Sequence, residues 1–383
     1  MTIKDFLNSK PRYYKNIDYT RMPRAYESVK EKLSLPKIIH IVGTNGKGST
    51  GRFLAYMLFK KGYKTGHYTS PHILKFNERI WINAKDIDDE SLENTHKKLL
   101  NILPKEFQES LSYFEYTTLL AAVSFEGLDF AVMEAGLGGE FDATNVFDKE
   151  LSLITAIDFD HQAFLGNSIE KIAKTKIRSI RKEAILGYQK HKSVEEIAKE
   201  VAKEIGCKLY MVDELLSKEE KSDIKEFISK KAYPIFFSEN LSLAFAAGKV
   251  LGVSLEIEDC FDLQIFGRFQ KVADNVVLDV GHNPLAAKAI ERELRPDTVL
   301  VYNAYEDKDF KEVLKILKPK IKRVEIIDIE DERAVDKEEL INVLRELGIK
   351  YGDFKRVEKE EEYLVFGSFR VAEEFLKGGF SAS

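Results

Sequence analysis

The chain has 383 residues, of which 44% are hydrophobic and 32% charged, and its formal net charge is −5. This length predicts two globular domains, and the charge balance argues against a general affinity for nucleic acid. No apolar run is long enough to span a membrane, and the N-terminus lacks the apolar core of a signal peptide. Cys207 and Cys260 are far apart in sequence and form no metal pattern, so we expect a reducing, cytoplasmic location.

A strand, a glycine-rich turn and a helix follow one another early in the chain. Residues 11–35 predict a lead-in and one helix, and KIIHIVG, from Lys37, is an apolar β-branched run typical of a buried parallel strand. The helix after the turn, which extends to about Tyr63, is amphipathic, with apolar residues at Phe53, Leu54, Met57 and Leu58.

The turn from Gly43 to Ser49 has the composition of a phosphate-binding loop. Backbone N–H groups and the helix dipole favour a phosphate there, Lys47 adds a positive charge, and Ser49 or Thr50 can hold magnesium. The loop departs from GxxxxGK[ST], because Ile41 replaces the first glycine and Gly48 follows the lysine. The alternative is an incidental glycine- and serine-rich connection, but the flanking strand and helix favour nucleotide binding.

The rest of the first domain alternates between helices and strands. After a strand at 64–69, residues 70–85 show no clean period, and we expect a long functional loop there. The lysine- and glutamate-rich residues 214–232 predict a solvated face. The predicted helices are 89–102, 113–125, 169–181, 194–205 and 240–251, and the predicted strands are 129–134, 151–157, 184–187 and 208–212.

Polar residues follow two of these strands. Glu134 precedes Gly136 at a strand end, where it is either a magnesium ligand or an exposed loop glutamate. Asp160 and His161 follow the next strand, and such a histidine is more often a hydrogen-bonded structural residue than a ligand. Taken alone, His72 is an equally weak candidate, and Lys176 on its helix would be a surface lysine.

From about Phe266 the alternation of strand and helix restarts. Strands are predicted at 276–279, 298–302, 323–327 and 362–366, and helices at 284–294, 310–317, 337–347 and 369–377. Asp279 ends the first of these strands, His282 follows it and Arg268 precedes it. These side chains suit acid–base catalysis or the binding of a ribose and phosphates. The predicted fold is α/β: a doubly wound P-loop ATPase domain at 1–265, then a smaller Rossmann-like domain at 266–383.

Several segments together resemble the Mur ligase superfamily, and within it the folylpolyglutamate synthase/dihydrofolate synthase family. The segments are HIVGTNGKGST, YTSPHI with FNERI, MEAGLGGEFDATNV, DHQAFLG with IAKTK, GRFQ, DVGHNP, EDKD and FGSF. They occur in the family's order from about residue 15 to 370. GTNGKGS and the segment from SPH to FNER are similar to the folate branch rather than to cell-wall Mur ligases.

The resemblance implies roles for individual residues. The implied ATP site comprises Thr44, Asn45, Gly46, Lys47, Gly48, Ser49, Thr50, Asn240, Arg268, Asp279 and His282. The implied metal ligands for two Mg²⁺ ions are Ser70, Glu134 and His161, and the implied catalytic residues are Lys47, Lys176 and His161. The implied folate site comprises Pro71, His72, Phe76, Glu78, Arg79, Tyr116, Asp142 and Ala143. A carbamylated Lys176 is also implied, but Arg178 lies where the family has a small residue, and Glu140 where it has arginine.

The implied activity is an ATP-dependent ligase that adds L-glutamate to dihydropteroate, to reduced folates or to both, through an acyl phosphate. Its partners would be these small molecules alone, with ATP, Mg²⁺ and K⁺ as cofactors, and it would be a monomer. The smaller domain would contribute nucleotide and amino-acid contacts. The alternatives are a Mur-type ligase with another carboxylate acceptor and a nucleotide-dependent switch NTPase, which would need the phosphate loop but not Arg268, Asp279 and His282.

Overall fold

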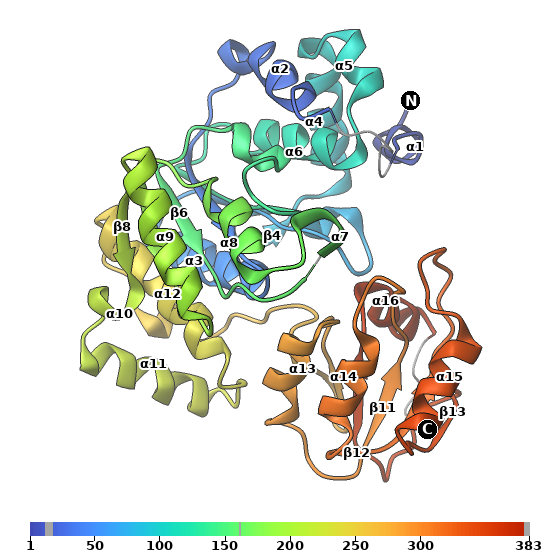
Figure 1. Cartoon of the computed structure of the whole chain (residues 1–383). Helices are drawn as coiled ribbons and strands as arrows, with labels where there is room; N and C mark the ends of the chain where they lie inside the picture. The colour runs from blue at the N-terminus through green and yellow to red at the C-terminus, as the bar shows by residue number, and fades with distance from the viewer. Residues whose placement is uncertain (12–17, 161, 379–383) are drawn as a thin grey trace. The chain divides into compact units, whose positions relative to one another are not determined.

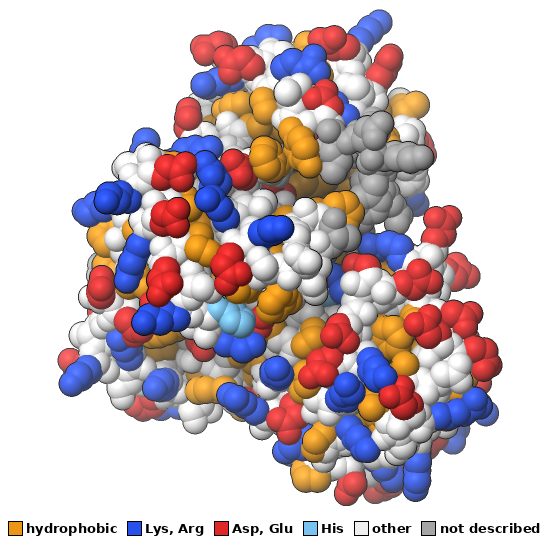
Figure 2. Space-filling model, in the orientation of Figure 1, with side chains coloured by type: hydrophobic (Ala, Val, Ile, Leu, Met, Phe, Trp, Pro, Cys, Tyr) orange, Lys and Arg blue, Asp and Glu red, His pale blue; other side chains and the backbone are white. Residues whose placement is uncertain are grey.

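The computed structural model describes residues 1–11, 18–160 and 162–378 (Figure 1). The chain divides into two compact units, which we describe separately: Met1–Phe227 with Glu239–Leu263, and Ile228–Ser238 with Gln264–Ser383. Within the described ranges no helix is long and apolar enough to cross a membrane. On the face shown in Figure 2, basic and acidic side chains lie interspersed.

The first unit is built on a mostly parallel sheet in the order β4-β3-β2-β5-β1-β6-β7-β8. Its strands are β1 Lys37–Val42, β2 Thr65–Tyr68, β3 Ile80–Ile82, β4 Lys85–Asp86, β5 Phe130–Glu134, β6 Leu151–Ile154, β7 Glu183–Leu186 and β8 Lys208–Met211. In this order, the strands β2, β5, β1, β6, β7 and β8 each pair in parallel with the next. The strands β3 and β4 pair antiparallel at the edge beside β2. The central strands are buried on both faces, which explains their continuous apolar sequences.

Helices connect these strands. The longer ones are α3 Lys47–Lys60, α4 Asp89–Ile102, α6 Tyr113–Ser124, α8 Ile169–Ile177, α9 Lys192–Ile205, α11 Lys218–Lys230 and α12 Phe237–Leu251. The shorter ones are α1 Ile3–Asn8, α2 Arg21–Glu27, α5 Lys105–Ser110, α7 Gln162–Leu165 and α10 Val212–Leu215, with 3₁₀ turns η1 Lys30–Lys32, η2 Phe76–Arg79, η3 Ala143–Val146 and η4 Ile257–Cys260. The alternation of strands and helices confirms the predicted α/β class.

Two predictions for this unit were wrong in part. Residues 70–85 are not one long loop, because they contain η2, β3 and β4. Strands of two or three residues are too short to show a period of two in the sequence. Residues 214–232 are not only a solvated face, because α11 buries Ile224 and Phe227 on its apolar side.

One face of this sheet is covered by two apolar clusters. Ile38 of β1 belongs to a cluster with residues of α4 and α6, and Ile154 of β6 belongs to a second cluster with α8 and α9. Side chains along a strand point alternately to the two faces of the sheet, so His40 of β1 lies on the same face as Ile38 and Val42. On this face it lies between the two clusters. On the opposite face, Gly51 of α3 packs closely against His67 of β2.

The second unit has its own sheet in the order β13-β12-β11-β14-β10-β9, parallel except for β9. Its strands are β9 Gln270–Ala273, β10 Val276–Leu278, β11 Thr298–Tyr302, β12 Ile321–Ile326, β13 Tyr351–Asp353 and β14 Tyr363–Phe366. Its helices are α13 Pro284–Glu291, α14 Phe310–Leu317, α15 Lys337–Glu346 and α16 Phe369–Lys377. All four predicted strands and four predicted helices are present, whereas the edge strands β9 and β13 were missed.

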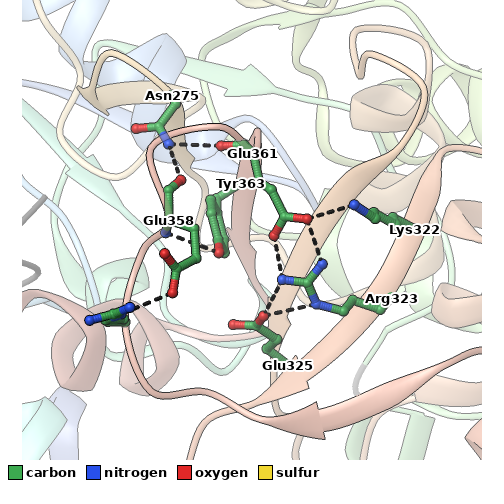
Figure 3. Close-up of polar contacts among 8 residues, drawn as sticks. Asn275, Lys322, Arg323, Glu325, Glu358, Glu361 and Tyr363 are labelled. Atoms are coloured by element: carbon green, nitrogen blue, oxygen red, sulfur yellow. Dashed lines mark hydrogen bonds and ion pairs between the residues drawn. The ribbon is translucent and has the colours of Figure 1, made fainter. Parts of the chain in front are cut away.

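A charged network fastens the segment before β14 to β12 (Figure 3). Arg323 donates to Glu325 through Nε at 2.9 Å and to Glu361 through Nη1 at 2.8 Å, and Lys322 donates to Glu361 at 2.6 Å. Asn275 donates to the carbonyl oxygens of Glu358 and Glu361 at 2.9 and 2.7 Å. The hydrogen bonds from Arg323 and Lys322 lower the pKa of Glu361 to about 2.

The low pKa of Glu361 makes the acid stability of this unit testable. Because the folded value lies below the ordinary 4.5, the network stabilises the fold fully above about pH 4.5 and loses this contribution as the pH falls toward 2. We expect Glu361→Gln to lower the free energy of unfolding by about 1 kcal/mol at pH 7 and to flatten its decline below pH 4.5. Chemical denaturation between pH 3 and 7 measures both effects. Glu360→Gln, at the exposed neighbouring position, is the control, and equal behaviour of the two variants would contradict the assignment.

Candidate active site

The phosphate loop lies between β1 and α3 of the first unit. Gly46 caps the helix with φ +86°, a left-handed conformation, and a Cβ atom there would lie 2.3 Å from Asn240 Oδ1. Asn240 also accepts a hydrogen bond from the Thr50 hydroxyl at 3.4 Å. The Thr44 hydroxyl donates to the carbonyl of Asp158 at 2.9 Å and accepts its N–H at 3.1 Å. The loop is therefore held by α12 and by the segment after β6, and it directs a helix N-terminus at one spot.

A cation and a carboxylate meet beside this loop. Lys47 Nζ donates to the carbonyls of Gly43 and Thr44, each at 3.2 Å, and lies 3.9 Å from Glu134 Oε1 at the end of β5. Glu134 is 4% exposed, and its other oxygen accepts the Thr69 hydroxyl. The parallel pairing of β1 and β5 places the two strand ends side by side, which brings these groups together.

The donors at this position fit magnesium. Magnesium prefers oxygen ligands and is commonly bound by one or two carboxylates together with substrate phosphates. Glu134 offers a buried carboxylate, and Ser70 offers a hydroxyl next in sequence to the Thr69 that contacts it. The described residues contain no group of three or more His, Cys, Asp and Glu side chains able to hold a metal by themselves. His161, the third predicted ligand, lies outside the described residues.

Lys176 contacts the start of the phosphate loop. It projects from α8, is 3% exposed, and donates from Nζ to the carbonyl of Gly43 at 2.9 Å. The glycine-rich segment after β5 packs on the same helix, because a Cβ atom at Gly139 would lie 2.4 Å from the carbonyl oxygen of Lys176. The lysine that the sequence offers as a surface residue is therefore part of this site's framework.

The two departures from the family pattern pair with each other. Arg178 Nε lies 3.4 Å from Glu140 Oε1, and Arg178 Nη2 donates to Glu204 at 2.7 Å. Glu140 also donates its N–H to the carbonyl of Thr175 at 2.8 Å. Glu140, which follows the glycines, and Arg178, which caps the C-terminus of α8, thus connect the same two segments. Sequence spacing gave no signal of this pairing, since the partners are distant along the chain.

The predicted folate-site residues of the segment after β2 are interconnected. The Glu78 carboxylate accepts the N–H groups of Ile73, Leu74 and Lys75 at 2.7, 2.8 and 2.7 Å. It therefore fixes the turn that begins at Pro71 and His72 and ends at Phe76. Arg79 donates to His72 Nδ1 at 2.8 Å, the ring of His72 meets that of Phe76 edge-on at 6.1 Å, and the guanidinium of Arg79 lies 5.3 Å from the Tyr113 ring centre. Tyr113 was not among the predicted residues.

The other predicted folate-site residues are buried. Tyr116 is fully buried, with its hydroxyl 2.8 Å from His96 Nδ1 and its ring 4.6 Å from that of Phe6. Asp142 and Ala143 are each 7% exposed at the start of η3. Burial raises the pKa of Asp142, and hydrogen bonds from Thr144 and from the N–H of Leu137 oppose the rise. The half-buried Phe114, which sequence reasoning missed, lies against Gly136, where a Cβ atom would be 2.5 Å from its ring.

The predicted residues of the second unit surround the end of β10. Asp279 is 4% exposed and accepts the N–H of Phe269 at 2.8 Å and that of Gly281 at 2.7 Å. Burial raises its pKa, and the charge of Arg268 opposes the rise. The Arg268 guanidinium lies 5.1 Å from the Phe369 ring centre, and His282 Nδ1 is 3.2 Å from the carbonyl of Val280. This arrangement ties the turn before β9 to the turn after β10.

Comparison with known proteins agrees with this geometry. A family model described as the Mur ligase glutamate ligase domain matches residues 267–370. Together with the phosphate loop of the first unit, it defines the chain as a P-loop ligase of the Mur type. A dihydrofolate synthase/folylpolyglutamate synthase of Haemophilus influenzae is 31% identical over 405 aligned residues, which cover 91% of this chain and 91% of that protein.

Solved structures give the same result. The crystal structure of Helicobacter pylori folylpolyglutamate synthetase is 39% identical, with a TM-score of 0.79 over 98% of this chain and 97% of that one. The bifunctional folylpolyglutamate synthase/dihydrofolate synthase of Yersinia pestis, complexed with AMPPNP and a Mn ion, is 25% identical, with a TM-score of 0.80 over 98% and 96%. The chain belongs to the dihydrofolate synthase/folylpolyglutamate synthase family of ATP-dependent ligases, which confirms the resemblance found in the sequence.

The close approach of Gly46 to Asn240 predicts a severe effect of a single methyl group. Gly46→Ala puts Cβ 2.3 Å from Asn240 Oδ1 at a left-handed position, so we expect it to displace the loop and reduce ATP binding at least about 30-fold. Gly62→Ala is a matched control, because Gly62 has φ +90° with no atom of the described residues within 4 Å of its Cβ position. Calorimetric titration with a non-hydrolysable ATP analogue measures the difference, and equal affinities in both variants would contradict this account.

Proposed function

We propose that the chain is an ATP-dependent ligase that joins L-glutamate to dihydropteroate, to reduced folates or to both, through an acyl phosphate. The observation that carries the proposal is the pairing of Lys47 with the buried Glu134 beside a phosphate loop. Membership of a family whose named members are dihydrofolate and folylpolyglutamate synthases supports the substrate class.

The chemistry requires activation of a carboxylate. Its oxygen attacks the γ-phosphorus of ATP, ADP leaves, and the acyl phosphate that forms is a far better acylating agent. The amino nitrogen of glutamate then attacks the acyl carbon, phosphate leaves, and the nitrogen loses a proton. In this proposal the N–H groups at the start of α3 and the ammonium of Lys47 bind the phosphate oxygens and offset their growing charge.

Glu134, with Ser70 and His161, is proposed to hold Mg²⁺, which neutralises phosphate charge when bound. Thr44, Asn45, Gly48, Ser49, Thr50 and Asn240 in the first unit, and Arg268, Asp279 and His282 in the second, are the proposed nucleotide contacts. Lys176 fixes the carbonyl of Gly43, and either its ammonium or a carbamate nitrogen can donate that hydrogen bond. Carbamylation of Lys176, a K⁺ site, the monomeric state and the cytoplasmic location stay predictions.

The segment after β2, with Asp142 and Ala143, is the proposed acceptor site. Its turn is rigid, because Glu78 holds three of its N–H groups and Arg79 is fixed by His72 and Tyr113. The rings of Phe76 and Phe114 offer flat apolar surface of the kind that packs on a heteroaromatic ligand.

Release of ADP with defined acceptors tests the function. With ATP, Mg²⁺ and L-glutamate present, we expect dihydropteroate, tetrahydrofolate or both to raise ADP release at least about tenfold, with a product heavier by one glutamyl residue. A UDP-muramyl peptide acceptor should have no effect. Mass spectrometry of the acceptor, coupled to an ADP assay, measures both quantities. Turnover that ignores every acceptor would favour the switch NTPase, and turnover with the muramyl acceptor alone would favour the Mur-type ligase.

Substitution of Lys47 tests the phosphate loop separately. We expect Lys47→Ala to lower the rate of product formation at least about 100-fold, because it removes the cation next to the phosphates. Lys60→Ala, at the exposed far end of α3, should keep the wild-type rate. Lys60→Ala should unfold within about 1 kcal/mol of the wild type, whereas Lys47→Ala leaves the buried Glu134 carboxylate without its cation and should be less stable, so circular dichroism first establishes that it is folded. Wild-type activity in folded Lys47→Ala would refute the role of this lysine.

A further inference from the structure

His40 is a buried polar residue in the middle of the parallel sheet. It is fully buried on β1 and lies on the sheet face that the two apolar clusters cover, in the seam between them. Its register partner on β6 is Ser152, which is also fully buried. Buried polar groups in such a position are costly unless they are hydrogen-bonded, so each contact of His40 carries information.

The hydrogen bonds fix the protonation of His40. Its Nε2 lies 2.7 Å from the Thr144 hydroxyl oxygen, and the Thr144 hydroxyl donates to Asp142 Oδ1 at 2.6 Å. Since that hydroxyl has one hydrogen and gives it to the carboxylate, it must accept from His40, and Nε2 carries the proton. Burial holds the pKa of His40 well below its ordinary value, and the charges of Lys149 and Arg181 lower it further, so the ring is neutral.

The second ring nitrogen of His40 is Nδ1. Among the described residues it has no hydrogen-bond partner, and the same holds for the hydroxyl oxygen of Ser152. A neutral Nδ1 is a hydrogen-bond acceptor and the Ser152 hydroxyl is a donor, but the two make no direct hydrogen bond. The hydrogen-bonded line therefore runs from His40 through Thr144 to Asp142, and Ser152 is not part of it.

Asp142 is the end of this line and belongs to the proposed acceptor site. Its Oδ1 accepts the N–H of Thr144 at 2.9 Å in addition to the hydroxyl, and its Oδ2 accepts the N–H of Leu137 at 2.8 Å. The carboxylate therefore closes the glycine-rich segment onto η3. Oδ1 is held by the N–H and the hydroxyl of Thr144 together, and the hydroxyl oxygen is in turn held in position by the N–H of His40.

We propose that His40 is a positioning residue for the acceptor site, acting through Thr144 on the Asp142 carboxylate that meets the folate-type substrate. This inference rests on the proposed function, since Asp142 is a substrate contact only if the acceptor binds there. A second contact to the same segment comes from Lys149, which donates to Ser179 O at 2.6 Å and to Asn145. Lys149 contacts Asn145 of η3, whereas His40 contacts the Thr144 side chain that donates to Asp142.

Replacement of His40 by residues with and without a donor tests the proposal. His40→Leu removes the N–H that holds the Thr144 hydroxyl oxygen in position beside Asp142, so we expect the KM for the folate-type acceptor to rise about tenfold. The KM values for ATP and glutamate should stay within about twofold, since the phosphate loop is untouched. His40→Gln keeps an N–H at a similar reach and should restore the acceptor KM to within about threefold of wild type.

Controls separate positioning from general damage. Ser152→Ala, equally buried but without contact to Thr144, should leave the acceptor KM unchanged. Thr144→Val should raise that KM at least as much as His40→Leu, and Thr144→Ser should not, which decides the matter if His40→Leu fails to fold. An unchanged acceptor KM in folded His40→Leu or Thr144→Val, or an equal rise for all three substrates, would overturn the proposal. If the wild type itself shows no acceptor-dependent ADP release, the proposed function is wrong instead.

Discussion

The site depends on the parallel pairing of β1 with β5. This register aligns Ile41 with Glu134, so that the phosphate loop after one strand and the carboxylate at the end of the other share one edge of the sheet. At that edge Lys47 and Glu134 lie 3.9 Å apart, both largely buried. Two opposite charges this close and away from water attract each other strongly. In the proposed function the lysine binds phosphate oxygens and the carboxylate binds a metal ion.

Close approaches of the backbone make the edge compact. Gly43, Gly46 and Gly139 each lie where a Cβ atom would clash, with Thr155, Asn240 and the Lys176 carbonyl respectively. Gly43 and Gly46 of the phosphate loop thus pack on the side chains of Thr155 and Asn240, and Gly139, in the segment after β5, packs on the backbone of α8. Lys176 can then donate to Gly43, and Asn240 can reach Thr50, which links three segments that are distant along the chain. The rigidity of the loop is thus a property of its neighbours as much as of its own sequence.

A polar seam complements this apolar architecture. The sheet face under α4, α6, α8 and α9 is apolar except where His40 and Ser152 lie, and there the glycine-rich segment ends in Asp142 and Thr144. A polar group in such a place destabilises the fold unless its bonds are satisfied, and satisfied bonds fix its neighbours in one arrangement. In this seam His40 holds the Thr144 hydroxyl, and that hydroxyl, with the N–H groups of Thr144 and Leu137, orients the carboxylate of Asp142.

The sequence by itself determined the α/β class, the phosphate loop and the family. Each of these depends on a signal that can be recognised in the sequence alone: long apolar strands such as β1 and β5, glycines next to a lysine, and motifs in a fixed order. Only the tertiary structure decided which residues meet. The edge strands β3 and β4 were too short to show a period, Glu140 and Arg178 pair across many residues, and Glu78 proved to shape a turn. In the sequence, His40 is not distinguished from the other residues of a buried strand, because a hydrogen bond to the distant Thr144 produces no pattern along the chain.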